Sequence, residues 1–373
     1  MAAKTRDAAA FVRERHDAFR AEWSWLECSG MLGDLGTLLP LLLAMAEVGA
    51  IKLAAALFWM GLFNIVGAYQ WDLPMPVQPM KTIAAAAIAD GLSAGETAAA
   101  GLFVGGAVLI LGATGLVELV NRVVPRTVVS GIQLGLGIRM VALALTFMGA
   151  EPWRAVDGPV AGGAFFLVAI ALLRRRERKF PVALFLVGAG LVLAAAAAAA
   201  RGGVGAAARE TWRAWRPGRV DLAPRAPSPR DWVRGILRAG LPQLPLTTLN
   251  SVISVTALAR KLFPDKEPPA TRVGVATSVG VMNVVGCWFG GAPACHGAGG
   301  LAGQYRFGAR GGASVFALGL LKIAVALVLG DALALRAVRA FPLSVLGALL
   351  AVAGLVLAAA GAGADGAAPA CLA

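Results

Sequence analysis

Pro74-Met75-Pro76-Val77-Gln78-Pro79-Met80-Lys81 and the segment behind it decide the fold of this chain. The prolines favour an extended backbone, and the apolar stretch at 79–90 that follows is short. A helix needs roughly 17–25 residues to cross about 30 Å of hydrocarbon. A second short apolar segment, 294–305, follows Gly290-Gly291-Ala292-Pro293. Each segment therefore predicts a half-helix that begins inside a membrane.

Ten longer apolar runs surround the two half-helices and predict an all-α polytopic membrane protein. Of the 373 residues, 58% are hydrophobic and 15% are charged, with a mean hydropathy of +0.73. Soluble domains have about 45–50% apolar and about 25% charged residues, so an ordinary soluble enzyme is excluded. The runs lie at 31–46, 53–69, 98–120, 127–149, 158–173, 180–200, 236–258, 273–292, 311–330 and 341–361.

The two half-helices occupy matching places in two halves of the chain. Each is the third segment of its half, after a first run that carries polar residues and an ordinary second run. Interrupted segments at matching positions are typical of a transporter's binding site. The predicted parts are an N-terminal cytoplasmic lead-in at 1–27, a first transmembrane repeat at 28–200, a polar linker at 201–230, a second, shortened repeat at 231–361 and a tail at 362–373.

The net charge of +13 is interpreted as a topology signal rather than as a nucleic-acid interface. With the N-terminus in the cytoplasm, the basic loops at 122–126, 174–179, 260–266 and 306–310 all fall inside. The linker at 201–230 then falls outside although it is rich in arginine, against the usual rule.

A helix that starts inside a membrane presents free backbone N–H groups and the positive end of its dipole, which favours an anion. The segments 241–256 and 290–306 contain no Asp or Glu before Arg306, whereas side-chain donors are frequent. A set of donors without carboxylates favours an oxyanion over a cation. The predicted substrate-binding residues are Gln78, Lys81, Gln243, Thr247, Asn250, His296, Gly297, Gly299 and Gln304.

Two charged residues are candidates for coupling or gating. For Asp34 we consider a proton acceptor, a salt-bridge partner of Lys81 and a helix cap. Arg139 serves the site or pairs with Asp34. Gln133 and Asn283 are interpreted as hydrogen bonds between helices.

Four motifs resemble those of the molybdate transporter family of plants, algae and bacteria, a branch of the sulfate permease superfamily. The resemblance runs from about residue 28 to about 330 and implies import of molybdate, a tetrahedral dianion. It also implies a uracil-permease-like fold of two inverted seven-segment repeats, in which a core domain with the half-helices moves against a gate domain. The motifs are Gly33-Asp34-Leu35-Gly36-Thr37, Pro74 to Lys81 as quoted above, Gln243-Leu244-Pro245-Leu246-Thr247-Thr248-Leu249-Asn250-Ser251 and Cys295-His296-Gly297-Ala298-Gly299-Gly300-Leu301-Ala302-Gly303-Gln304-Tyr305.

The second half departs from this pattern, because it supplies five segments before the tail. About twelve segments are therefore expected in place of the family's fourteen, with two gate segments missing.

We predict a secondary active transporter that imports molybdate by alternating access. A transporter of sulfate or another oxyanion and a non-transporting oxyanion-binding membrane protein are the alternatives. We expect no enzymatic activity, catalytic residue, metal site or cofactor, since the chain has only two histidines and no nucleophile with a neighbouring base. The expected partners are the oxyanion and the lipid bilayer, with no nucleic acid, and a homodimer is considered. The sequence leaves open whether the plasma membrane or an organelle membrane holds the protein.

Overall fold

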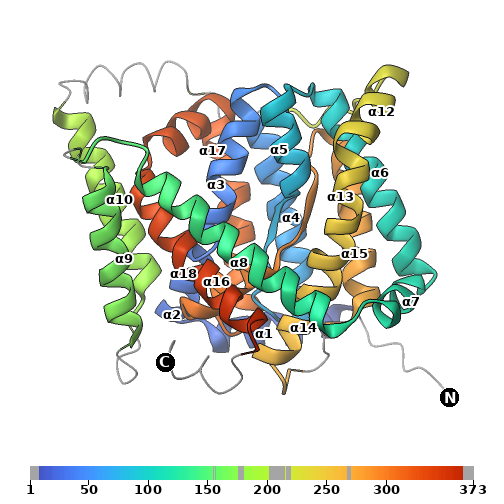
Figure 1. Cartoon of the computed structure of the whole chain (residues 1–373), viewed down its shortest axis with the longest axis horizontal. Helices are drawn as coiled ribbons and strands as arrows, with labels where there is room; N and C mark the ends of the chain where they lie inside the picture. Colours follow the sequence, from blue (N-terminus) through green and yellow to red (C-terminus); the bar gives the residue numbers. More distant parts are fainter. Residues whose placement is uncertain are drawn as a thin grey trace.

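The computed structural model describes residues 8–153, 155, 157–174, 180–200, 215, 220–266 and 270–363. Most of the predicted linker at 201–230, and the tail beyond 363, lie outside these described residues. The first half contains α1 (Ala8–Glu22), α2 (Trp25–Leu32), α3 (Leu35–Glu47), α4 (Leu53–Trp71), β1 (Val77–Pro79), α5 (Lys81–Asp90), α6 (Ala94–Ala113), α7 (Leu116–Val123), α8 (Arg126–Met148), α9 (Pro159–Arg174) and α10 (Val182–Ala200) (Figure 1).

The second half begins with one long helix that includes two π-helical stretches. This helix consists of α12 (Pro229–Gly235), a π stretch at Ile236–Gly240, α13 (Leu241–Leu246), a second π stretch at Thr247–Ser254 and α14 (Val255–Leu262). The remaining elements are α15 (Arg272–Gly286), a 3₁₀ turn at Cys287–Phe289, β2 (Ala294–His296), α16 (Ala298–Arg306), α17 (Gly312–Ala340) and α18 (Leu343–Gly361).

The predicted apolar runs become helices, with differences in four of the runs. In the described part of the chain, seven helical segments are long and apolar enough to cross a membrane, and α9 and α10 are shorter apolar helices. The run at 31–46 is divided at Gly33-Asp34, and the run at 98–120 is divided at Gly115, where φ is 74°. The run at 236–258 contains the π-helical stretches. The run at 311–330 continues to Ala340 past a break at Gly330, where φ is 66°. Glycine adopts this left-handed conformation without steric cost, so the chain changes direction there.

Glycines let paired helices touch backbone to backbone. A Cβ at Gly61 of α4 would lie 2.7 Å from the carbonyl oxygen of Gly319 in α17. A Cβ at Gly137 of α8 would lie 2.6 Å from the carbonyl oxygen of Gly354 in α18. Small residues of this kind are the usual means of packing helices in a bilayer, where helix association has no hydrophobic driving force.

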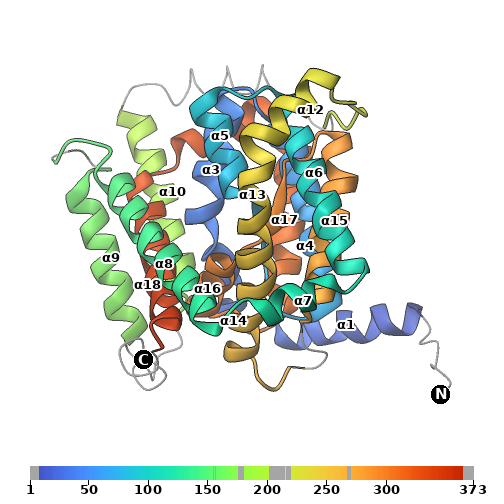
Figure 2. The same ribbon diagram turned by 45° about the vertical axis from the view of Figure 1, so that its right-hand side comes forward.

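The helices form two groups, which Figure 2 shows side by side. We call α8, α9, α10 and α18 the gate group, and α2–α6 with α12–α17 the core group. Helix α18 is the element at the boundary, since it packs on α8 and α9 and also on α3 and α16 of the core group. The half-helices α5 and α16 both belong to the core group.

A two-stranded antiparallel sheet joins the half-helices. Val77 pairs with His296, Gln78 with Cys295 and Pro79 with Ala294. The N–H of Met80 also donates to the carbonyl of Pro293 at 2.8 Å. Because each strand leads directly into its half-helix, the pairing brings the N-termini of α5 and α16 together. The two helices then run to opposite ends of the molecule (Figure 1).

The described parts of the loops predicted to be cytoplasmic lie at one end of the molecule, which we call the inner end. Helices α1, α7 and α14 lie there (Figures 1 and 2). Arg306 donates to the carbonyl of Leu173 at 3.3 Å, and Arg272 forms an ion pair with Glu118 at 2.7 Å. The described part of the linker lies at the opposite, outer end, where Lys52 pairs with Asp221 at 2.6 Å. The hydrogen bond from Lys52 lowers the pKa of Asp221 to about 2.

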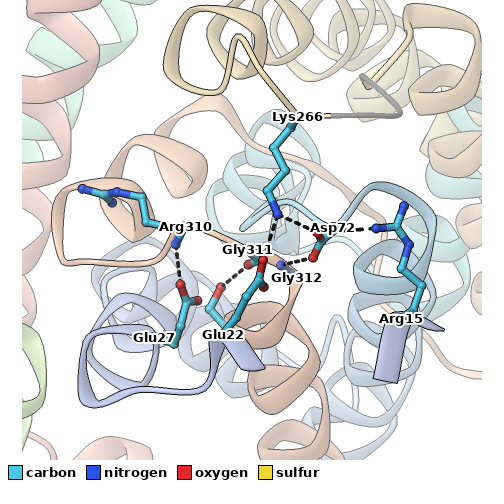
Figure 3. A network of polar contacts seen from close by, with 9 residues as sticks. Arg15, Glu22, Glu27, Asp72, Lys266, Arg310, Gly311 and Gly312 are labelled. Carbon is cyan, nitrogen blue, oxygen red and sulfur yellow. Dashed lines mark hydrogen bonds and ion pairs between the residues drawn. The ribbon is translucent and has the colours of Figure 1, made fainter. Parts of the chain in front are cut away.

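A polar network anchors α1 to the inner end of the core group (Figure 3). Lys266 donates to Glu22 at 2.9 Å and to Asp72 at 2.5 Å, while Asp72 also accepts from the N–H of Gly312 at 2.9 Å and pairs with Arg15. Burial raises the pKa of Glu22, against the hydrogen bond from Lys266. Burial lowers the pKa of Lys266, but the hydrogen bonds to Asp72 and Glu22 outweigh it and raise that pKa above its usual value. The N-terminal helix is thus held on three separate segments of the core.

Candidate functional site

The first backbone N–H groups of α16 are donors without a hydrogen-bond partner in the described structure. Gly297 precedes the helix in an extended conformation and its carbonyl accepts from Leu301 at 3.1 Å. In the described structure, the N–H groups of Ala298, Gly299 and Gly300 make no hydrogen bond. Free N–H groups at the positive end of a helix form an anion-binding site in an apolar surrounding.

Lys81 is the cation that faces this helix end. It is the first residue of α5, and a Cβ at Gly297 would lie 3.7 Å from its Nζ. The Nζ is buried and has no hydrogen-bond partner. An ammonium group that is buried without a partner is costly, because its lost hydration is not replaced. The position therefore suits a bound anion that would complete the charge.

Gln78 extends along this helix end, with its Oε1 beside Gly297, as Lys81 is, and its Nε2 beside Gly300 and Asp34. The amide Nε2 of Gln78 donates to Asp34 Oδ1 and to Thr37 Oγ1, which in turn bonds Asp34. A Cβ at Gly300 would lie 2.9 Å from Asp34 Oδ1. Neither Gln78 Oε1 nor Asp34 Oδ2 has a partner.

Two of the three roles considered for Asp34 are wrong. It precedes α3, but its side chain makes no capping bond, because the carboxylate faces Gln78 instead. No ion pair joins it to Lys81 within the described residues, since Lys81 Nζ makes no hydrogen bond and faces α16. The role of a proton acceptor stays a prediction.

Sequence reasoning missed Lys322, a second buried cation at the site. Its side chain is 3% exposed, and its Nζ donates to the carbonyl of Val77 in β1 at 2.9 Å. The charges of Lys322 and Lys81 both act on Asp34. A signal was available, because Lys322 interrupts the apolar run at 311–330, and intramembrane charges usually have a function.

Two asparagines hold the strands at equivalent places. The Oδ1 of Asn64 in α4 accepts from the N–H of Val77 at 2.6 Å. Asn283 in α15 bonds both backbone groups of Ala294, at 2.6 and 2.8 Å. Asn283 was predicted to bond another helix, but it bonds a strand. The same prediction for Gln133 is confirmed, because its side chain donates to the carbonyl of Ser254 at 3.3 Å.

Three predicted ligands come from the long helix of the second half. Gln243 Oε1 accepts from the N–H groups of Thr82 and Ile83 at 2.8 and 3.3 Å, so it caps α5. Its Nε2 donates to Thr247 at 2.7 Å. Asn250 is buried, and its Oδ1 has no partner. The N–H groups at the start of α5 therefore bond a protein oxygen, whereas those of Ala298, Gly299 and Gly300 in α16 have no partner in the described structure.

The structure does not bring three other candidates to this point. His296 is fully buried against Trp71, with ring centroids 5.1 Å apart, and its Nε2 lies 3.2 Å from Ser278 Oγ. Gln304 Oε1 accepts from Ser314 at 3.2 Å, far along α16. Arg139 lies on the exposed face of α8 and has no ion pair with Asp34, whose carboxylate is buried. Arg139 points away from the site because of its place on the helix: the next residue, Met140, is on the buried face of α8.

We expect Gly300→Ala to weaken oxyanion binding by the purified protein at least tenfold. The new Cβ would lie 2.5 Å from Gln78 Nε2 and 2.6 Å from Pro76 Cγ, so the wall of the site must move. Gly106→Ala in α6 is the control, because a Cβ there meets nothing within 4 Å. Isothermal titration calorimetry with molybdate measures both variants, and equal affinities would remove Gly300 from the site.

Comparison with solved structures shows which fold the chain has. The transmembrane domain of the cyanobacterial bicarbonate transporter BicA matches with a TM-score of 0.54 and 18% identity over 88% of each chain. Murine Slc26a9, an anion transporter in the inward-facing state, matches with a TM-score of 0.56 and 14% identity over 94% of this chain and 65% of its own. The chain is an integral, multi-pass membrane protein with the inverted-repeat fold of these transporters, as predicted.

Sequence comparison gives the family. The model described as "Molybdate transporter of MFS superfamily" matches residues 26–140 and 235–357. Molybdate transporter 2 of Arabidopsis thaliana is 38% identical over 89% of this chain and 78% of its own length. Molybdate transporter 1 of Chlamydomonas reinhardtii is 37% identical over 93% and 86%. The chain belongs to the molybdate transporter family, a family of transporters and not of enzymes, and the predicted resemblance is confirmed.

Proposed function

We propose that the chain imports molybdate as a secondary active transporter, and that the oxyanion binds between Lys81 and the N-terminus of α16. The observation that carries the proposal is the buried, unpartnered Nζ of Lys81 facing the free N–H groups of that helix. Charge-assisted hydrogen bonds from an ammonium group and from backbone N–H groups are the interactions that hold oxyanions. The names of the curated relatives support molybdate as the cargo.

Charge balance at the site favours a dianion bound together with a proton. Lys81 and Lys322 supply two positive charges, and Asp34 supplies one negative charge when it is ionised. A proton on Asp34 leaves two positive charges to balance a dianion. Uncompensated charge inside a membrane protein is unfavourable, so the neutral combination is preferred.

The orientation of Gln78 gives an independent reason for the same proton. Its carbonyl oxygen faces Gly297 at the anion position, while its Nε2 faces the carboxylate of Asp34. An anion at that position requires a donor, so the side-chain amide of Gln78 must rotate to place its NH₂ group there. The carbonyl oxygen of Gln78 would then face Asp34, and only a protonated carboxyl group can donate to it. We infer that Asp34 takes up a proton when the oxyanion binds.

Alternating access requires the core group to move against the gate group. The gate group reaches the site through Met140, whose Sδ would lie 2.7 Å from a Cβ at Gly299. It also touches the core group where Gln133 donates to Ser254. Among the described residues, two further hydrogen bonds join the groups, from the N–H of Ala183 to Ser29 and from Arg306 to the carbonyl of Leu173. So small a number of polar contacts fits a moving interface.

Uptake of labelled molybdate by proteoliposomes that contain the purified chain tests this function. We expect saturable uptake, which excess unlabelled molybdate suppresses and an equal excess of sulfate suppresses less. Equal suppression by both anions would indicate a general oxyanion transporter. Binding without uptake would indicate a non-transporting oxyanion-binding protein. A homodimer stays a prediction, and light scattering of the detergent-solubilised chain measures it.

A further inference from the structure

A large cavity opens at the inner end between the gate group and the core group. Its volume is about 820 Å³. Its walls are α7, the first turns of α8, α14, the start of α15 and the end of α18. The cavity is thus built from both moving groups, at the end where the predicted cytoplasmic loops meet.

The charges on the walls of this cavity are all positive. Five cationic side chains line it, and its lining contains no Asp or Glu. Arg272 is paired with Glu118 at 2.7 Å. Within the described part of the chain, Arg122, Arg126 and Arg260 form no ion pair with a carboxylate. The remaining lining cation is Lys261.

The N-terminus of α8 adds a second positive feature. This helix of 23 residues begins at Arg126, directly after Pro125, and both residues line the cavity. The carbonyl of Pro125 accepts from Val128 and Val129. The N–H groups of Arg126 and Thr127 make no hydrogen bond in the described structure. The helix dipole therefore adds to the arginine charges at the same wall.

The cavity is separate from the site at α16. Gln133 is the lining residue that lies furthest along α8. It donates to the carbonyl of Ser254, and this bond joins the gate group to the core group. Met140, which contacts the end of α16, lies seven residues further along α8, a rise of about 10 Å. Both positions lie on the buried face of α8, so a ligand in the cavity would occupy a different place from one at Lys81.

We propose that this cavity is a second anion site, for a tetrahedral phosphate-type oxyanion. Three exposed arginines without a carboxylate partner in the described residues, and a helix N-terminus, line this one cavity. Guanidinium and backbone N–H groups are the donors that bind phosphate groups. Such a group is present in free inorganic phosphate and in the headgroup of an anionic phospholipid. The proposal rests on the cavity and its charges, and it does not depend on the identity of the transported anion.

Binding of inorganic phosphate to the purified full-length chain tests the proposal. The cavity variant is Arg122→Gln/Arg126→Gln/Arg260→Gln, and we expect it to bind phosphate at least tenfold more weakly than wild type. The control variant is Arg13→Gln/Arg20→Gln/Arg174→Gln, which removes three exposed charges at the same end but outside the cavity. Equal weakening in both variants, or no weakening in the cavity variant, would overturn the site.

A second variant tests the cavity without removing any of its side-chain contacts, in case the triple variant does not fold. Ala257 is exposed on the cavity wall, so Ala257→Glu adds a negative charge without removing a contact. It should also weaken phosphate binding, and unchanged binding would contradict the proposal. Lys81→Met should leave this binding in place, which separates the cavity from the transport site.

Nanodiscs distinguish the two sources of phosphate. In discs of phosphatidylcholine alone, wild type should bind inorganic phosphate. If added phosphatidylglycerol abolishes that binding in wild type, the lipid headgroup is the occupant. If binding persists, the occupant is the soluble anion. A cavity variant that binds like wild type in both kinds of disc would refute the site.

Discussion

Replacing Lys81 with methionine should weaken molybdate binding to the purified protein by roughly 10- to 150-fold, since a charged hydrogen bond contributes about 1.5–3 kcal/mol. Methionine keeps most of the side-chain volume and removes the charge, so the packing at the start of α5 is retained. The Nζ of Lys81 is buried and has no other partner, so no other hydrogen bond of this ammonium group is lost. Uptake into proteoliposomes should fall with binding.

Two further variants make this result specific. Lys81→Arg keeps the charge and should retain part of the binding, although the planar guanidinium fits the space differently. Lys52→Met removes a cation at the outer end, where Lys52 pairs with Asp221, and should not change the affinity. An unchanged affinity in Lys81→Met would place the oxyanion elsewhere.

Replacing Asp34 with asparagine should remove the pH dependence of molybdate binding. In wild type, one proton bound with each oxyanion makes the affinity fall by up to about tenfold per pH unit as the pH rises. The amide introduced by Asp34→Asn would donate an N–H to the carbonyl of Gln78 at every pH, as a protonated Asp34 does. The groups that face Asp34 are Thr37 on its own helix, Gln78 on β1, Lys81 on α5, Gly300 on α16 and Lys322 on α17.

Titrations between about pH 5.5 and 8.5 measure this effect, a range in which exposed carboxylates and lysines do not titrate. Asp90→Asn is the matched control, because Asp90 is exposed at the far end of α5. It should keep the wild-type pH dependence. Wild-type binding that does not change with pH, or an Asp34→Asn variant that follows the wild-type curve, would exclude Asp34 as the site of the proton.

Local sequence was enough to predict the half-helices. The prolines before 79–90 and the glycines before 294–305 indicate an extended backbone ahead of each half-helix, and they also limit the length of the apolar segment that follows. The pairing of β1 with β2 could not be predicted, because its register depends on residues more than 200 positions apart. The run at 311–330 ends where the structure has the break at Gly330, but the helical segment that follows the break to Ala340 was not predicted, since it carries Asp331, Arg336 and Arg339 and is too short and charged to be read as an apolar run.

At the site, the residue types predicted which polar and charged groups are present, but not which atoms each of them contacts. Lys81 and Gln78 lie beside the end of α16, and their role as ligands stays a prediction. Gln243 has the expected place but uses its oxygen on α5, because a free helix end attracts whichever acceptor the fold brings near. His296 belongs to the right motif, yet alternation along β2 turns its ring toward Trp71.

The pairing of β1 with β2 also has a consequence for biosynthesis. When the ribosome has made Val77, its partner His296 is still about 220 residues away, which at 5–20 residues per second is a delay of about 10–45 s. During this time, the peptide groups of the first strand have no strand partner, and bare peptide groups are unfavourable in lipid. Asn64, which is made earlier and accepts from the N–H of Val77 in the folded chain, is placed to satisfy this one peptide group before the second half is inserted.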